Sequence, residues 1–466
     1  MKKMIVIVLT AVAAITAVII LNNTDAKADK VIYVALNGDD ENNGTKSKPF
    51  RTLEKAASVA QAGTTVYIRE GTYHEKLVVK HSGTDSNPII FSAYQDEKVV
   101  ISGSNHTESD GDTALITIDD KNNISIFGLS IQDLSTNLSD ETVIGIYVTG
   151  SSSHITLENN HVHGITTNSE NGNGHGIAIY GTGEMNDINI VNNIVEELKL
   201  GSSEAIVLNG NINGFTVNGN TVRRSDNIGI DMIGYEGISK DKEHDFVRNG
   251  MVKDNDVYEI SSFGNPAYGE EYSAAGIYVD GGKNISIEGN TVYKNDIGIE
   301  ATSEHSGKSA DNITITNNVV YHNYYTGISI GGYDENRGGT KNTTIAHNIM
   351  YRNDTEGLEG GQLLLQYNTQ YNSIEGNILT AGPSRIFIAN YFTANKENEL
   401  KNNVFHSEEG KEGIWVWKDE EYRSFSEFLE ASNGDESSRY IDPEYRNEKT
   451  FDFDLIEDSP AKEIIE

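Results

Sequence analysis

A short motif recurs along most of the chain: an aliphatic residue, two variable positions, Asn, one further position and an apolar residue. Between its copies, apolar and polar residues alternate in runs of four to six, as in half-buried β-strands. The copies follow one another at intervals of 26 to 35 residues, with their asparagines at Asn160, Asn193, Asn220, Asn255, Asn290, Asn318, Asn348, Asn377 and Asn403. This period, without any long helical pattern, predicts a solenoid of short parallel strands.

A second anchor, usually Gly followed by Ile, recurs in phase with these asparagines, at residues 145, 176, 205, 229, 276, 298, 327 and 357. We expect the aliphatic positions to stack into a continuous core and the asparagines to stack at one corner, each amide bonding its equivalent in the next coil. The alternative is an antiparallel all-β protein with coincidental Asn turns. The nine in-phase copies favour the solenoid.

The composition agrees with this architecture. Gly (45 residues) and Asn suit its turns, whereas Pro (6 residues) would remove hydrogen-bond donors from the strands. The absence of Cys excludes disulfides, Cys-ligated metals and a thiol nucleophile. The formal net charge of -34 disfavours binding to nucleic acid, whose phosphates an acidic surface repels.

The N-terminus resembles an export signal. Lys2 and Lys3 precede an apolar run at residues 4–21, and Ala26 and Ala28 provide a cleavage site after Ala28. We therefore expect a secreted or cell-surface monomer without stable membrane insertion once the signal is removed. An uncleaved anchor is the alternative, because the apolar run is nearly long enough to span a bilayer.

The predicted organisation of the chain has four parts. A signal peptide occupies residues 1–28, an N-terminal cap and the first coils follow at 29–105, the parallel β-helix occupies 106–410, and a C-terminal coil and tail occupy 411–466. Residues 52–62 have helical spacing, with Thr52 as N-cap, and should cover the open end of the solenoid. A second short helix is expected at 424–431.

Both ends of the expected mature chain resemble a known superfamily. Residues 33–40 (YVALNGDD) and 71–75 (GTYHE) resemble the opening of secreted right-handed parallel β-helix proteins of the pectate-lyase-like superfamily, and residues 441–443 (IDP) and 453–455 (FDL) resemble their closing coil. The resemblance implies an all-β, single-stranded right-handed parallel β-helix with an N-terminal capping helix. It leaves the chemistry open, because one fold hosts many different sites.

Side chains on the outer face of the solenoid should carry that chemistry. Strand alternation places the second residue after each Gly anchor outside the core, which gives the column Tyr147, Ala178, Val207, Asp231, Tyr278, Glu300, Ser329 and Glu359. Candidate substrate-binding residues in and around this column are Tyr278, His175, Tyr180, Asn209, Glu304 and His305. The longest insertion, 235–275, contributes Tyr258, Tyr268 and Tyr272. Aromatic rings beside acidic groups suit a sugar chain.

Asp280 and Glu300, on adjacent coils, form the sharpest candidate pair. Strand geometry places their Cα atoms roughly 8 Å apart. At this separation the two carboxyl groups can act on one glycosidic bond, as an acid/base pair or as an acid and a nucleophile. Residues 276–280 (GIYVD) and 298–305 (GIEATSEH) resemble the catalytic region of β-helix glycoside hydrolases of the β-xylosidase type. That resemblance implies Asp280 as nucleophile and Glu300 as acid/base. We expect Asp231, Glu204 and Tyr278 to shape the cleft around this pair. Gly281 and Gly282 depart from that family, which has bulkier residues there.

A second enzyme class is also consistent with the sequence. Residues 225–231 (SDNIGID), with Glu204 one coil earlier, resemble the calcium-binding coils of family 9 pectate lyases, which implies calcium ligands at Glu204, Asn227 and Asp231. Those lyases use an outward Lys as base. Here the column offers Tyr278 instead, or Lys283 and Lys294 from nearby turns.

We therefore expect a carbohydrate-active enzyme that cleaves a polysaccharide or oligosaccharide, with hydrolysis favoured over calcium-dependent elimination. Calcium is a possible cofactor of the second mechanism only. A non-catalytic glycan-binding protein of the cell surface is the third alternative. A zinc or copper site at His154, His161, His163 and His175 is disfavoured, because strand alternation scatters these residues over different faces.

Overall fold

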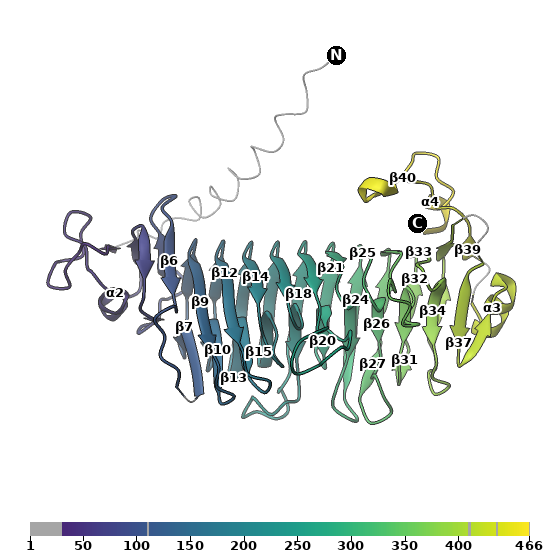
Figure 1. Ribbon diagram of the computed structural model, residues 1–466, viewed down its shortest axis with the longest axis horizontal. Coiled ribbons are helices and arrows are strands. Elements are labelled where there is room, and N and C mark those ends of the chain that lie inside the picture. Colours follow the sequence, from purple (N-terminus) through teal and green to yellow (C-terminus); the bar gives the residue numbers. More distant parts are fainter. Residues whose placement is uncertain (1–29, 110, 409–411, 435–436, 466) are drawn as a thin grey trace, which may run out of the picture.

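The chain forms a right-handed parallel β-helix, with strands stacked along the long axis of the molecule (Figure 1). This computed structural model describes residues 30–109, 111–408, 412–434 and 437–465. The predicted signal segment, 1–28, lies outside the described residues. Within the part of the chain that is described, no helix is long and apolar enough to cross a bilayer.

Each coil contributes strands to three faces. The described strands form a 26-stranded sheet and a 13-stranded sheet, almost entirely by parallel pairing, and a separate two-stranded antiparallel sheet near the C-terminus. The larger sheet makes two of the faces, because long strands turn a corner: the first part of β13 (Asn173–Val191) pairs with β10 (Glu141–Thr149), and its last part pairs with β11 (Ile155–Glu158).

We name two faces of the larger sheet by the strands that carry their central coils. The acidic face comprises the first parts of β13 and β15 (Ile206–Asn218), then β17 (Ile230–Ile233), β20 (Ala275–Asp280), β23 (Ile297–Thr302), β26 (Thr326–Ile330) and β30 (Leu363–Leu365). The amide face comprises the last parts of β13 and β15, then β18 (Arg248–Lys253), β21 (Lys283–Glu288) and β24 (Ser309–Thr316).

The third face is the 13-stranded sheet. Its central strands include β12 (His161–Thr167), β14 (Ile194–Leu198), β16 (Thr221–Ser225), β19 (Asp256–Ile260), β22 (Thr291–Tyr293), β25 (Val319–Tyr321) and β29 (Ile349–Tyr351). Tyr258, Tyr293 and Tyr321 stack along it, with ring centroids 4.7 and 4.8 Å apart.

The aliphatic anchors fill the core, as predicted. The ladder of Ile177, Ile206, Ile230, Ile277, Ile299 and Ile328 joins successive coils of the acidic face, and all six side chains are fully buried. Such burial is the main favourable contribution to the folding of a chain without disulfides.

The predicted asparagine ladder is confirmed over all nine positions. Each Nδ2 from Asn160 to Asn377 donates to Oδ1 of the next asparagine, over 2.9–3.1 Å. The same amides also donate to backbone carbonyls one coil earlier, for example Asn193 to Leu157 over 2.9 Å. The corner is buried and its polar groups are paired, so the ladder stabilises the stack.

Helices lie at both ends of the solenoid (Figure 1). Helix α2 (Leu53–Val59) buries Leu53, Ala56 and Ala57, and the Oγ1 of its N-cap, Thr52, accepts a hydrogen bond from the Lys55 amide. This is the predicted capping helix. At the other end, α3 (Phe425–Ser432) buries Phe428 against Trp415 and confirms the helix expected at 424–431.

Candidate functional site

The outward column of the acidic face follows the predicted order. Strand register joins Tyr147, Ala178, Val207, Asp231, Tyr278, Glu300 and Ser329 in successive coils. The last member was predicted wrongly: Leu364, rather than Glu359, pairs with Ser329. Gly357 and Leu358 lie in an exposed turn, and the true anchor of this coil is Gln362 with Leu363.

Glu300 lies in the middle of this column, on β23, where an acidic side chain has no role in packing the core. It is only 7% exposed. Its Oε1 accepts hydrogen bonds from Ser329 Oγ at 3.2 Å and from Gln366 Nε2 at 3.0 Å. Burial raises the pKa of Glu300 to about 7, despite these bonds. Near neutral pH the carboxyl group is therefore poised to give up or accept a proton.

Asp280 ends strand β20, one coil before Glu300. Tyr278 is the ladder partner of Glu300, so Asp280 lies diagonally across, two residues further along, and the predicted spacing of about 8 Å between Cα atoms follows. Asp280 is 5% exposed, and its Oδ1 accepts a hydrogen bond from the Glu304 amide at 2.7 Å. Burial raises its pKa well above the ordinary value, and Glu304 and Glu236 add to the rise.

The Gly-Gly pair after Asp280 has a structural reason. Gly281 has a φ of +76°, and a Cβ there would lie 2.8 Å from the ring of Tyr235. Glycine therefore allows the chain to turn while the Tyr235 ring packs directly against it. The departure from the hydrolase pattern at this point makes room for the ring of Tyr235.

Asp231 and Glu204 extend the acidic cluster towards the N-terminus. Asp231 is 2% exposed, and its Oδ1 is buried without a hydrogen-bond partner. Burial and the negative charges of Glu204 and Asp280 raise the pKa of Asp231 well above its ordinary value. Burial, together with Glu236, raises the pKa of Glu204 to about 8. Buried carboxyl groups this close cannot all ionise, so the cluster retains protons at neutral pH.

Tyr278 and Glu304 connect the centre of the cluster to its rim. Tyr278 is 5% exposed, and its hydroxyl donates to Glu304 Oε1 at 3.3 Å. Burial, followed by Asp280 and Glu300, raises the pKa of Tyr278 well above its ordinary value. Glu304 is 43% exposed, and its Oε2 lies 3.9 Å from Arg337. His305, next along the chain, lies at the same rim, 6.4 Å from Tyr235 between ring centroids.

The other predicted sugar-binding residues lie further along the face. His175 is 3% exposed, and its Nδ1 donates to the carbonyl of Glu204 at 3.1 Å while its Nε2 accepts from the Tyr180 hydroxyl at 3.1 Å. Burial lowers the pKa of His175 to about 4, so the ring is neutral and both nitrogens are used. Asn209 Nδ2 donates to Glu236 Oε2 at 3.0 Å, whereas its Oδ1 is buried without a partner.

The predicted calcium ligands are only partly brought together. Glu204 and Asp231 belong to one cluster, but Asn227 directs its Nδ2 towards the carbonyl of Gly201 at 3.2 Å and the Tyr268 hydroxyl at 3.4 Å. Over the described ranges, no group of three or more His, Cys, Asp or Glu side chains is placed to hold a metal ion. The unpartnered Asp231 Oδ1 is the feature that fits a cation.

Two loops rise beside the acidic face, where one long insertion was expected. Residues 234–247 and 261–274 are the loops, and strands β18 and β19 of the regular coil lie between them. Tyr268 and Tyr272 belong to the second loop, in which Phe263 stacks on Tyr272 with ring centroids 4.7 Å apart. The placement of Tyr258 in this wall was wrong, because it lies on β19 in the third face and stacks on Tyr293.

Gln366 and Tyr235 were missed. Gln366 lies four positions after the true anchor, Gln362, which is the column that also contains Asp280. The misplaced Gly357 anchor hid it, so a correct alignment of that coil would have revealed it. Nothing in the local sequence marks Tyr235, because its contact with Gly281 arises from loop packing.

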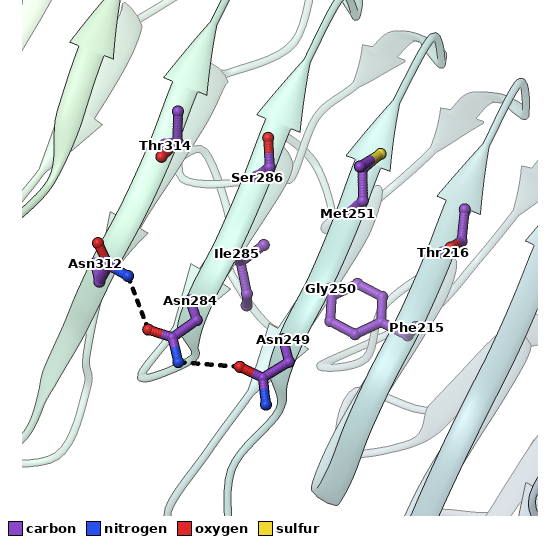
Figure 2. A pocket seen from close by; sticks show the side chains of 10 residues that line it. All are labelled: Phe215, Thr216, Asn249, Gly250, Met251, Asn284, Ile285, Ser286, Asn312 and Thr314. Atoms are coloured by element: carbon purple, nitrogen blue, oxygen red, sulfur yellow. Dashed lines mark hydrogen bonds between the residues drawn. The ribbon is translucent and has the colours of Figure 1, made fainter.

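The amide face carries a pocket of different character (Figure 2). It encloses about 480 Å³, and its lining includes Phe215, Met251, Ser286 and Thr314 but no titratable side chain. Asn249, Asn284 and Asn312 run along its edge, joined by hydrogen bonds of 3.0 and 2.8 Å. With no acid, base or nucleophile that can exchange a proton near neutral pH, this pocket offers little for catalysis.

Similar proteins place the chain in a family. Residues 32–194 match the Pel9A-like, right-handed β-helix region, and residues 248–424 match the right-handed β-helix region. The uncharacterized protein YwoF of Bacillus subtilis strain 168 is 58% identical over 435 residues, which cover 93% of this chain and 92% of YwoF. The pectate lyase PEL9 of Emericella nidulans is 37% identical over 92 residues, 19% of this chain and 22% of that protein.

A solved structure supports the same fold. The GH136 lacto-N-biosidase from Eubacterium ramulus superposes with a TM-score of 0.50 at 16% identity, covering 86% of this chain and 68% of that one. An identity this low informs on the fold alone. By its near full-length similarity to YwoF and its two β-helix regions, the chain belongs to the YwoF family, within the pectate-lyase-like superfamily of right-handed parallel β-helix proteins.

Proposed function

We propose that the acidic face cleaves a glycosidic bond of a polysaccharide or oligosaccharide by hydrolysis. Glu300 is the proton donor, and Asp280 is the nucleophile or the base that activates water. The observation that carries the proposal is the position of Glu300: buried in mid-strand, held by Ser329 and Gln366, with a pKa of about 7 and a second carboxyl group diagonally adjacent.

The proton balance of the cluster supports this division of roles. A hydrolase of this type needs one protonated and one ionised carboxyl group at the same pH. The Glu304 amide donates to Asp280 and stabilises its ionised form, whereas the Glu300 carboxyl receives only neutral side-chain donors. Glu300 is also among the charges that raise the pKa of Asp280, so ionisation of one of these two carboxyl groups favours the protonated form of the other.

The relatives are consistent with a carbohydrate substrate. The E. nidulans protein that matches part of the chain is named a pectate lyase, and the E. ramulus structure with the same fold is named a lacto-N-biosidase. The rings of Phe263 and Tyr272 stand in the loop beside the acidic face, where they offer apolar surface to a sugar.

The test is a reducing-end screen across plant, algal and microbial polysaccharides, with and without calcium. Once a substrate is found, Glu300→Gln and Asp280→Asn should each abolish release of reducing ends. Glu288→Gln, which removes a carboxylate from the amide face, serves as the matched control and should retain activity. Full activity of both Glu300→Gln and Asp280→Asn would refute the proposal.

Calcium-dependent elimination is the second candidate, and the orphaned Asp231 Oδ1 favours it. Asp231 and Glu204 would hold the cation, which would offset the negative charge of the cluster and help bind an acidic sugar. The candidates for the general base are the weakest part of this mechanism, because each is engaged elsewhere. Tyr278 has a raised pKa and donates to Glu304, Lys283 lies over the ring of Phe246, and Lys294 pairs with Glu259 on the third face.

Product analysis separates the two mechanisms. Hydrolysis yields no new double bond, whereas elimination yields an unsaturated sugar that absorbs in the ultraviolet. Formation of an ultraviolet-absorbing product, abolished by addition of a chelator, would refute the hydrolytic mechanism. Glycan binding without cleavage, unchanged in Asp280→Ala and Glu300→Ala, would instead identify a non-catalytic binding protein.

A further inference from the structure

A basic hollow lies beside the acidic cluster. It encloses about 470 Å³ and is lined by Tyr235, Phe246 and four lysines, Lys242, Lys283, Lys308 and Lys341, together with small and acidic residues. The whole chain has only 36 Lys and Arg against 70 Asp and Glu. Four lysines around one hollow are therefore an exception to the charge of the molecule.

The lysines come from separate parts of the fold. Lys242 belongs to the 234–247 loop, Lys283 begins β21, Lys308 lies in the turn after β23, and Lys341 ends β27 (Gly339–Lys341). The loop and three successive coils therefore build the hollow together. A run of neighbouring lysines on one strand would be an ordinary solvated surface, but this arrangement depends on tertiary structure.

Half of this positive charge has no acidic counterpart in the lining of the hollow. Lys341 pairs with Asp311 at 3.5 Å, but no ion pair joins Lys242, Lys283 or Lys308 to any of the described residues. Glu243 is the other acidic residue of the lining, which leaves the hollow with a net charge of about two positive units. Ammonium groups held together repel one another, and an anion between them relieves that repulsion.

Aromatic rings hold two of these ammonium groups in place. Lys283 Nζ lies 4.3 Å from the centroid of the Phe246 ring, and Lys308 Nζ lies 4.6 Å from the centroid of the Tyr235 ring. These contacts favour fixed positions over free rotation of the long side chains. The groups are thus partly preorganised, which lowers the cost of binding a ligand.

Tyr235 connects the hollow to the acidic cluster. Its ring packs against Gly281, the residue directly after Asp280, and lies 6.4 Å from the ring of His305. Tyr235 also lines the hollow. A chain molecule that lies over Asp280 and continues past Tyr235 therefore reaches the lysines within a short distance.

We propose that the lysine hollow is a subsite for an anionic sugar, one that carries a carboxylate or sulfate group, in the polymer that the acidic face cleaves. The proposal rests on the proposed function and narrows its substrate to an acidic polysaccharide. The negative cluster acts at a bond between sugars, while the anionic substituent of a neighbouring sugar is held by Lys242, Lys283 and Lys308 on the far side of Tyr235.

Binding to a cleavage-deficient protein tests the proposal. Glu300→Gln protein is titrated calorimetrically with oligogalacturonate, a sulfated oligosaccharide and neutral xylo-oligosaccharide, at low and at physiological salt. We expect at least one anionic probe to bind, more weakly at higher salt, and the probe that binds identifies carboxylate or sulfate as the preferred group. Absence of binding by both anionic probes overturns the proposal.

Lysine variants in the same background locate the binding. Lys283→Met with Lys308→Met should weaken the anionic probe at least tenfold and leave any neutral probe within twofold. Lys253→Met, on the neighbouring strand outside the hollow, is the matched control and should stay within twofold. If the double variant unfolds, Lys242→Met replaces it as the test, because this single change lies on an exposed loop and should be tolerated by the fold. Unchanged affinity in the lysine variants refutes the proposal.

The outcome is separable from that of the proposed function. If Glu300→Gln protein still cleaves its substrate, the assigned mechanism fails, but lysine-dependent binding of an anionic probe still supports the subsite. If Glu300→Gln protein is inactive and binds only neutral probes, the mechanism stands and the subsite fails.

Discussion

The acidic face and the amide face are outer surfaces of the same coils, yet their polar groups differ in exposure to solvent. On the amide face, Asn249, Asn284 and Asn312 bond one another in the open, and the pocket beside them has no titratable group. On the acidic face, Asp231 and Glu300 are buried, and burial raises the pKa of each.

The difference shows what the coil supplies and what it leaves to individual side chains. Backbone pairing and the corner asparagines are common to every central coil, so they stabilise both faces alike. The acidic face adds buried carboxyl groups, and burial gives them the raised pKa values that are common among groups that transfer protons. The following predictions test this contrast.

Loss of the Glu300 carboxyl group should have the largest effect. Glu300→Gln keeps the size of the side chain but removes the transferable proton, so we expect kcat to fall by about 10²–10⁴-fold. The measurement is release of reducing ends from the substrate found by screening. Glu288→Gln on the amide face should keep kcat within about twofold. An equal loss in both variants would remove the distinction between the faces.

Interruption of the buried ladder should destabilise the fold strongly. Asn290→Ala leaves the amide of Asn255 without its acceptor and the carbonyl of Val252 without its donor. Buried polar groups without partners are costly, so we expect the free energy of unfolding to fall by about 3 kcal/mol. Denaturant unfolding followed by circular dichroism measures it. A change below about 1 kcal/mol would mean that the coils do not depend on this corner.

The free energy of unfolding should also depend on pH, because Glu300 of the acidic face binds its proton more tightly in the folded chain. The pKa of Glu300 is about 7 in the folded chain against an ordinary 4.5, so the folded chain binds more protons between these values. Its contribution to stability is complete below about pH 4.5 and is lost as pH rises through 7. Thermal unfolding from pH 4.5 to 8 should show this decline, less steeply in Glu300→Gln. An identical slope in both proteins would contradict the buried position of Glu300.

We expect Asp231 to lower the stability of the folded protein relative to a neutral residue at the same position. Its Oδ1 has no partner and the carboxyl group lies buried among other acids, so Asp231→Asn removes the cost of either protonating this group or burying its charge. We expect the free energy of unfolding at pH 8 to rise by about 1 kcal/mol, while activity falls. Unfolding midpoints and reducing-end assays on the same preparation test both parts. Lower stability would show that another group already pairs with Asp231.

The smallest effect is expected on the amide face. Asn284→Gly breaks two exposed hydrogen bonds, to Asn249 and from Asn312, and water can replace both, while glycine tolerates the φ of +54° at this position. We expect the free energy of unfolding to stay within about 0.5 kcal/mol and activity to remain unchanged. Comparison with Asn290→Ala then shows how much the burial of an otherwise similar asparagine ladder contributes.

Periodicity made the fold and part of the site predictable. The corner asparagines and the column from Tyr147 to Ser329 repeat at every coil, so their neighbours follow from counting. The prediction failed where the count was interrupted: Gly357 imitates an anchor in an exposed turn, and the error hid Gln366. The packing of Tyr235 depends on a loop, which no repeat encodes.

The asparagine corner also has a consequence for how this protein can change over generations. Each Asn amide gives a donor to one neighbour and presents an acceptor to the other, so every rung is interchangeable with the next. A duplicated or deleted turn shifts everything beyond it by one strand spacing, about 4.8 Å, and leaves the joint chemically identical. Mutation can therefore add or remove whole coils at positions away from the carboxyl groups, and the lengthened or shortened chain keeps the same pattern of core and corner contacts.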